Sequence, residues 1–197
     1  MTARRHLLVG FLVAVSLVAG CAKADQDRSA TSSGSGSGSN QASTTTSSSE
    51  DFVAQADDFV NLADMTAVRD FFVDNRSGHL AEAVAIARDG GTGTYPVGTI
   101  IQLIPQEAMV KRRAGFDPGS NDWEFFELDI SEEGTTIHQR GGAEIVNRFG
   151  SGSCSSCHSA AEPEYDFVCE DDHGCEPLPV SDEFIDDLQA NDIRPRA

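Results

Sequence analysis

Apolar residues recur every three or four positions between residues 51 and 75, and this spacing places them on one face of a helix. The pattern predicts one or two helices there, with an apolar face made of Phe52, Ala56, Phe59, Val60, Ala63, Ala67, Phe71 and Phe72. The alanine-rich segment 79–88 predicts a further helix, because Asp89-Gly90-Gly91 follows it as a stop signal. We therefore expect the first part of the domain to be helical.

The pattern changes after residue 91. Three segments rich in β-branched and aromatic residues, 95–104, 123–130 and 135–139, are separated by turn residues such as those of GFDPGSND and SEEGT. They predict antiparallel strands, and 143–149 predicts a short helical or irregular segment. The predicted fold class is α+β, a mainly antiparallel β-sheet domain with N-terminal helices.

The N-terminus has the pattern of an export signal. Arg4 and Arg5 precede an apolar run, 7–19, that is too short for a membrane-spanning helix. The run ends in Leu-Val-Ala-Gly-Cys, which resembles the lipobox of bacterial lipoproteins, so residues 1–20 are expected to be a signal peptide and Cys21 the acylated first residue. Ala22 follows, where Asp would favour retention at the inner membrane, so the resemblance favours a lipid anchor in the outer membrane, facing the periplasm.

Residues 29–50 contain no large apolar side chain, so nothing there offsets the entropy cost of ordering. We expect residues 21–50 to be a lipid-anchored, flexible Ser/Gly-rich linker and 51–197 to be the folded domain. Four of the 14 basic and three of the 32 acidic residues precede residue 51, so the domain holds ten basic and 29 acidic residues. This acidity argues against binding to nucleic acid or anionic lipid and leaves basic partners open.

Four cysteines remain besides Cys21, and the first two belong to Cys154-Ser-Ser-Cys157-His158. C-x-x-C-H is the attachment motif of c-type haem, in which two thiols add to the porphyrin vinyl groups and the histidine binds the iron. Two intervening residues put both sulfurs on one side of a helical turn, and the next residue can reach the iron. Attachment occurs outside the cytoplasm, which agrees with the export signal. The motif predicts haem c as the cofactor, with Cys154, Cys157 and His158 holding it and His158 as the metal ligand.

Other interpretations of these residues stay open. Cys154 and Cys157 could be a structural disulfide or a redox dithiol, and a zinc site could draw on the cysteines together with His158 and His173. An oxidising compartment favours a disulfide between Cys169 and Cys175. A second axial haem ligand could come from Met109, His173, His79 or His138.

Three short motifs follow one another in the domain: Tyr-Pro-Val-Gly-Thr at 95–99, Asn-Asp-Trp-Glu-Phe-Phe at 121–126, and C-x-x-C-H near the C-terminus. Their order after a helical lead-in resembles the cytochrome P-460 family and its relative cytochrome c′-beta, over about residues 90–165. The resemblance implies an antiparallel sheet with flanking helices and a five-coordinate c haem with a proximal histidine. It also implies a distal face that oxidises hydroxylamine or binds small gases such as NO and CO, and a homodimer.

The chain departs from this family at one residue type. The hydroxylamine-oxidising members have a lysine cross-linked to the porphyrin on the strand after the Gly-Thr pair, and here that strand reads Thr-Ile-Ile-Gln-Leu-Ile. Lys111 is the single lysine of the domain and is a weak cross-linking candidate. Lys111, Arg112 and Arg113 could instead form an exposed basic turn, or an arginine could pair with a haem propionate.

The residues of the distal face would decide the reaction. Apolar candidates are Ile101, Leu103, Phe125 and Phe126, which would suit uncharged diatomic ligands, whereas an enzyme would need a proton-handling carboxylate. Glu124 and Glu127 are the weak candidates for that carboxylate, on opposite faces if their strand is regular.

Three hypotheses for the function follow. The first is an exported haem c lipoprotein that does redox chemistry or binds a small-molecule or gas ligand, including oxidation of a small nitrogen compound such as hydroxylamine, with a redox partner protein. The second is a six-coordinate electron-transfer cytochrome. The third is a haem-free, disulfide-braced lipoprotein that binds a partner in the envelope. The sequence does not decide whether the protein is a haem oxidoreductase or a binding protein.

Overall fold

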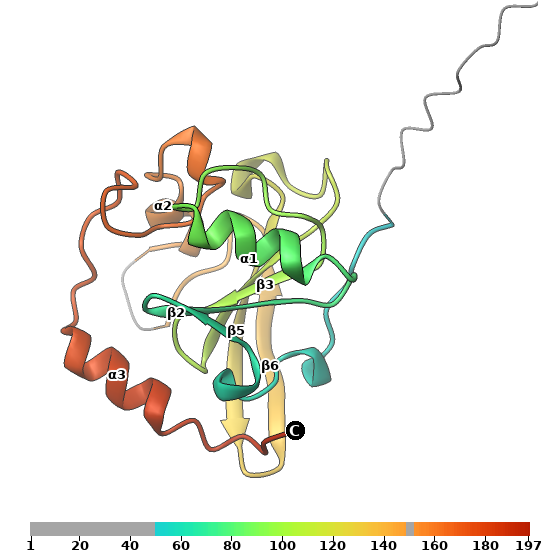
Figure 1. Ribbon diagram of the computed structural model, residues 1–197, viewed down its shortest axis with the longest axis vertical. Helices are drawn as coiled ribbons and strands as arrows, with labels where there is room; N and C mark the ends of the chain where they lie inside the picture. Colours follow the sequence, from blue (N-terminus) through green and yellow to red (C-terminus); the bar gives the residue numbers. More distant parts are fainter. Residues whose placement is uncertain (1–49, 149–151) are drawn as a thin grey trace, which may run out of the picture. The chain divides into compact units, whose positions relative to one another are not determined.

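A six-stranded antiparallel sheet in the order β1-β2-β3-β4-β5-β6 forms the centre of the computed structural model, which describes residues 50–148 and 152–197 (Figure 1). Each strand pairs with the next one along the chain. The strands are β1 (Thr66–Val68), β2 (Phe71–Asn75), β3 (Thr99–Gln102), β4 (Glu107–Lys111), β5 (Trp123–Ser131) and β6 (Gly134–Gly141). Together with its helices this sheet confirms the α+β class. The predicted signal peptide, Cys21 and linker lie outside the described residues.

The prediction of helices over 51–75 is wrong. This segment forms two single-turn 3-10 helices, Ala56–Asp58 and Leu62–Asp64, followed by the hairpin of β1 and β2. In β2, buried and partly buried residues alternate, which is the period of a strand. The apolar residues before β1 cover one face of the sheet instead, and the Phe59 ring lies 4.8 Å from that of Phe126. Packing against the sheet therefore outweighed the helical spacing.

The other predicted elements agree more closely with the structure. Helix α1 (Leu80–Arg88) occupies the predicted segment 79–88, and β5 and β6 match the predicted strands to within two residues. The predicted strand 95–104 shortens to β3, and β4 was missed. Residues 143–148 are irregular, apart from an isolated bridge between Val146 and Ser153.

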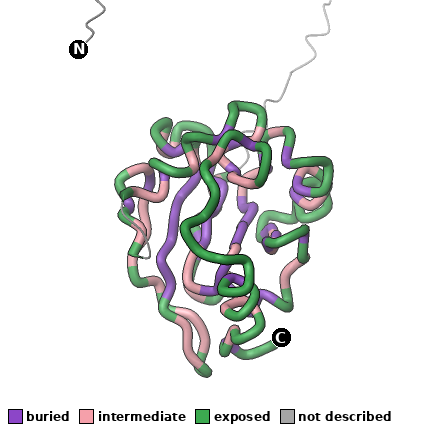
Figure 2. The backbone as a smooth tube through the Cα atoms, turned by 90° about the vertical axis from the view of Figure 1, so that its left-hand side faces the viewer, coloured by how far each residue is buried: buried purple, intermediate pink, exposed green. Residues whose placement is uncertain are grey.

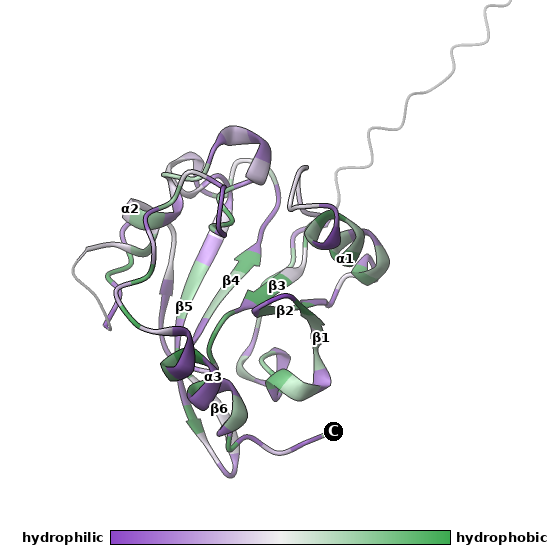
Figure 3. Ribbon diagram, turned by 60° about the vertical axis from the view of Figure 1, so that its left-hand side comes forward, coloured by the Kyte–Doolittle hydropathy of each residue, from purple (hydrophilic) through white to green (hydrophobic). Residues whose placement is uncertain are grey.

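The sheet has a different apolar core on each face. Residues 52–65 cover one face, where the core contains Ala54, Phe59, Ile100, Ala108, Val110, Phe126 and Leu128. Helix α1 contributes Ala83 and Ala87 to the other core, which contains Val68, Phe71, Val73, Tyr95, Ile101, Met109, Trp123, Phe125, Ile145 and Val168. We call this second face the cysteine face, because Cys154 packs against it. Figure 2 shows the buried backbone at the centre of the molecule, and Figure 3 shows the apolar character of β3 and β4.

The C-terminal segment returns to the sheet and to the N-terminal segment. Helix α3 (Asp182–Ala190) is attached by the Gln189 amide, which donates to Asp70 O at 2.7 Å and to Leu103 O at 2.8 Å. Beyond it, Arg194 Nη1 donates to Phe59 O at 3.1 Å and Asn61 Nδ2 donates to Arg194 O at 2.7 Å. Over residues 50–148 and 152–197, no helix is long and apolar enough to cross a membrane.

Candidate functional site

The C-x-x-C-H motif forms a helix of its own, α2 (Cys154–His158). Ser153 caps it by accepting a hydrogen bond from the Ser156 N–H at 3.2 Å. The helix is also fastened from outside, since Cys154 N donates to Ile145 O and Ser155 Oγ donates to Ala143 O, both at 2.8 Å. The two thiols therefore lie three residues apart on one helical turn, as the sequence predicted.

Neither thiol of α2 is in a disulfide. Cys157 is exposed, whereas Cys154 is partly buried against the cysteine face. Burial raises the pKa of the Cys154 thiol to about 12, and the nearby carboxylates of Glu107 and Glu127 raise it further. Cys154 is therefore a protonated thiol at neutral pH, which argues against the reactive thiolate of a redox dithiol.

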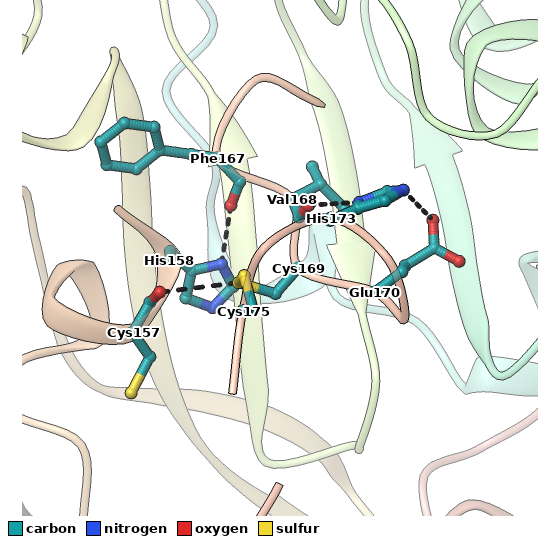
Figure 4. The surroundings of a disulfide bond; sticks show 8 residues. All are labelled: Cys157, His158, Phe167, Val168, Cys169, Glu170, His173 and Cys175. Carbon is teal, nitrogen blue, oxygen red and sulfur yellow. Dashed lines mark hydrogen bonds and ion pairs between the residues drawn. A yellow bond between two sulfur atoms is a disulfide. The ribbon is translucent and has the colours of Figure 1, made fainter. Parts of the chain in front are cut away.

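His158 has a defined orientation. Its Nδ1 lies 2.8 Å from the carbonyl oxygen of Phe167 (Figure 4). Its ring centroid lies 5.2 Å from that of Phe125. A carbonyl can only accept, so Nδ1 carries the proton. Burial lowers the pKa of His158, so the ring is neutral at neutral pH. The lone pair is then on Nε2, which is the arrangement of a metal-binding histidine.

The loop that holds Phe167 depends on the buried Asp166. Asp166 Oδ1 accepts from Lys111 Nζ and from Asn121 Nδ2, both at 2.6 Å, and Oδ2 accepts from Tyr95 N at 2.8 Å. The Asp166 carbonyl accepts from the Trp123 indole N–H at 2.6 Å. Burial raises the pKa of Asp166, and the ammonium group of Lys111 opposes this rise.

Lys111 is not on an exposed basic turn. Its side chain is buried, pairs with Asp166, donates to Asn121 O at 2.8 Å and lies 5.0 Å from the centroid of the Trp123 ring. Arg112 is also buried, and only Arg113 of the three is exposed. The expectation of a basic turn fails because three carboxylates, those of Asp51, Glu124 and Asp166, neutralise these residues inside the fold.

The two candidate carboxylates lie on opposite faces of β5. Glu124 is on the face that residues 52–65 cover, where it pairs with Arg112 and with Arg140, whose Nε lies 2.6 Å from Glu124 Oε1. Two guanidinium partners give Glu124 a structural role in this charge network. Glu127 is on the cysteine face, is almost fully buried and accepts from the Arg148 N–H.

Sequence reasoning missed the partner of Glu127. Glu107 stands directly opposite it on β4, in the register that pairs Met109 with Phe125. Burial raises the pKa of Glu107 to about 7, with a further rise from the charge on Glu127. No local sequence signal marks this pair, because it exists only through the pairing of β4 with β5.

The apolar distal candidates separate in the same way. Ile101 and Phe125 lie in the core of the cysteine face, with Leu103 packed against it, whereas Phe126 lies in the opposite core. Met109 is also buried on the cysteine face, paired with Phe125 across the strands. Phe126 is therefore excluded from a site at α2, and Met109 is retained.

The predicted disulfide between Cys169 and Cys175 is present (Figure 4). It closes a loop beside α2, and Cys169 Sγ lies 3.6 Å from Cys157 O. The disulfide removes these two cysteines from any zinc site. Among residues 50–148 and 152–197, no group of three or more His, Cys, Asp or Glu side chains could hold a metal ion.

The other three histidines of the described residues, His79, His138 and His173, lack the features of a haem ligand. His173 is buried, with Nδ1 2.7 Å from Val168 O and Nε2 3.1 Å from Gly90 O, and it stacks on Tyr165 at 3.7 Å. Both of its ring nitrogens are therefore used within the fold. His79 and His138 are exposed and lie beside Glu82 and Asp129.

The residues at α2 fit a covalently attached haem in three respects. Two free thiols and a neutral imidazole with an available Nε2 lie on one turn, and a backbone carbonyl orients that imidazole. The apolar core of the cysteine face lies directly beside this turn, since Cys154 packs against it. The sequence identified the three motif residues, but Asp166 and Phe167 have no sequence signal because their role depends on contacts with distant strands.

The comparisons with known proteins give no relative: no family model, no curated protein and no solved structure matches this chain.

Proposed function

We propose that residues 51–197 bind one c-type haem covalently, through thioether bonds to Cys154 and Cys157 and with Nε2 of His158 on the iron. One observation carries the proposal: the Phe167 carbonyl accepts a hydrogen bond from Nδ1–H of a partly buried, neutral His158, on the same helical turn as two free thiols. His158 is partly buried, and its Nε2 is not among the buried side-chain atoms that lack a hydrogen-bond partner, so this nitrogen is open to a ligand.

When bound, the haem supplies an iron that exchanges an electron and takes a small ligand. The chain's own residues would shape what reaches it. Phe125, which contacts the His158 ring, and Met109 beside it exclude water from this part of the sheet. Glu107 holds a proton near neutral pH, because desolvation and the neighbouring charge of Glu127 raise its pKa to about 7.

These residues support redox chemistry or the binding of a small gas such as NO or CO. Oxidation of hydroxylamine, which the resemblance to cytochrome P-460 suggests, has less support, because the only lysine near the site is engaged by Asp166 at 2.6 Å. The Glu107–Glu127 pair is the feature that would serve such an enzyme. By the N-terminal motifs, the domain would be held at the outer membrane through Cys21, facing the periplasm, with a redox partner protein.

Met109 favours a second candidate function. Its thioether lies buried on the cysteine face, and a methionine as second axial ligand is typical of electron-carrying cytochromes. In that case Met109 and His158 would both hold the iron, and the domain would pass electrons without binding a substrate.

An absorption spectrum of the full chain, produced in a host that matures c-type cytochromes, tests these proposals. We expect a c-type pyridine haemochrome in wild type and its loss in Cys154→Ser/Cys157→Ser. A reduced high-spin spectrum that changes with CO supports a vacant distal site, whereas a low-spin spectrum that Met109→Leu converts to high spin supports electron transfer. A strongly red-shifted reduced Soret band would indicate a cross-link to Lys111.

Wild type without covalent haem would contradict the proposal and favour a haem-free, disulfide-braced binding protein. Cys169→Ser/Cys175→Ser is the matched control, since it also removes two cysteines but should retain the haem.

A further inference from the structure

The loop that orients His158 has an unusual backbone. Asp166 and Phe167 both lie in the left-handed region, with φ of 51° and 66°, although neither is glycine. Each such residue costs of order 1 kcal/mol and persists only where surrounding contacts impose it. Phe167 packs against the core of the cysteine face, whereas Asp166, the residue before it, makes the polar contacts that tie this turn to distant strands.

Asp166 accepts four hydrogen bonds, and every donor is more than 40 residues away in the sequence. Three donors, Lys111 Nζ, Asn121 Nδ2 and Tyr95 N, reach its carboxylate, and the Trp123 indole reaches its carbonyl. Lys111 is the only one that carries a charge. Its side chain and that of Asp166 are 7% and 3% exposed, so the ion pair is shielded from solvent and salt.

We propose that Lys111 is a positioning residue for the proximal haem ligand: through Asp166 it sets the turn whose next carbonyl, that of Phe167, holds the imidazole of His158. This inference rests on the proposed haem attachment. It gives the single lysine of the domain a role as an anchor behind the histidine, in place of a cross-link to the porphyrin.

The consequence is electronic as well as geometric. A histidine that donates Nδ1–H to a carbonyl is a stronger ligand, and a stronger ligand stabilises ferric iron and lowers the reduction potential. Without the Lys111–Asp166 pair, the buried carboxylate loses its counter-charge and the turn relaxes. The hydrogen bond from His158 to Phe167 then weakens, and the potential should rise.

The direction of the shift in reduction potential distinguishes a positioning role of Lys111 from the direct effect of its charge on the iron. Removing a cation near a haem without other changes favours ferric iron and lowers the potential, because ferric haem carries the greater positive charge. Lys111→Met removes a cation, yet the proposal predicts a shift to higher potential. Arg113→Met is the matched control, because it removes an exposed cation two residues away.

The experiment uses the full-length protein matured with haem. We expect Lys111→Met to keep its covalent haem, to shift the midpoint potential upwards, and to move the iron–histidine stretching band of the reduced, five-coordinate form to lower frequency. Lys111→Arg, which keeps the charge, should restore part of both shifts. Arg113→Met should leave the vibrational band unchanged.

If Lys111→Met does not fold, Lys111→Met/Asp166→Asn provides the test, since it leaves no buried charge alone and keeps the net charge. It should show the same upward shift. Wild-type potential and vibrational band in a haem-loaded variant would overturn the inference, as would a shift to lower potential. Absence of haem from the wild type would instead contradict the proposed function.

Discussion

Glu107 and Glu127 stand opposite each other on neighbouring strands, with both carboxyl groups near the thiol of Cys154. Glu127 is 1% exposed, and Glu107 Oε1 has no hydrogen-bond partner among the described residues. Like charges directly opposite in a sheet are destabilising. Protonation of Glu107 should therefore stabilise the fold, and the group that can hold this proton lies on the cysteine face.

Glu107→Gln should remove a pH dependence of stability. The pKa of Glu107 is about 7 in the fold against 4.5 in the unfolded chain, so the folded state binds the extra proton between these values. The free energy of unfolding of wild type should then fall by about 3 kcal/mol as the pH rises from about 4.5 through 7. The variant should lack this contribution and be more stable than wild type above pH 7.

Urea denaturation across this pH range measures the difference between variant and wild type. Glu133→Gln, which neutralises an exposed carboxylate in the turn between β5 and β6, is the control. Parallel pH curves for Glu107→Gln and wild type would contradict the prediction.

Glu124→Gln should lower the free energy of unfolding and leave the haem spectrum unchanged. It leaves Arg112 and Arg140 without their shared carboxylate on the face opposite Cys154. Removing one member of a buried charge network costs about 3 kcal/mol, which chemical denaturation can measure. Asp129→Asn, on the same strand but exposed, should leave the stability almost unchanged. A normal stability combined with an altered haem spectrum in Glu124→Gln would refute this assignment.

Gly91 should tolerate alanine less well than Gly90. Both have left-handed φ, 76° and 72°, so either substitution costs about 1 kcal/mol in backbone strain. At Gly91 the new Cβ would also lie 2.8 Å from Cε1 of the buried His173, whereas at Gly90 no atom lies within 4 Å. Gly91→Ala should therefore lower the melting temperature further, and equal melting temperatures would show that the His173 loop yields freely.

Removal of the disulfide by Cys169→Ser/Cys175→Ser should destabilise the fold by about 2 kcal/mol, the chain-entropy value for so short a loop. Wild type denatured in the presence of a reductant should lose the same amount of stability as the variant, because the reductant breaks the same bond. A variant as stable as oxidised wild type would mean that the loop is already ordered by His173, which bonds Val168 and Gly90.

The elements that could be predicted are those whose signals are local. The stop signal after α1, the turns that flank β5 and the spacing of C-x-x-C-H depend only on neighbouring residues, and each is found in the fold. Segment 51–75 could not be predicted in this way. Its phenylalanines have the spacing of a helix, but they pack in the cores of a sheet whose other strands come from residues further along the chain. Strand β4 is short and buried almost throughout, so it lacks the alternation that reveals a strand.

The sequence by itself determined the chemistry available to this protein: two thiols and a histidine in attachment spacing, a further pair of cysteines, a single lysine and an excess of carboxylates. Only the tertiary structure decided which of these groups meet. It placed Lys111 against Asp166 behind His158, and Glu107 against Glu127 beside Cys154, and it directed Glu124 to the far face. Residue types and local spacing are properties of the chain, whereas partners 20 to 55 residues apart depend on strand register and loop closure, which cooperative packing selects.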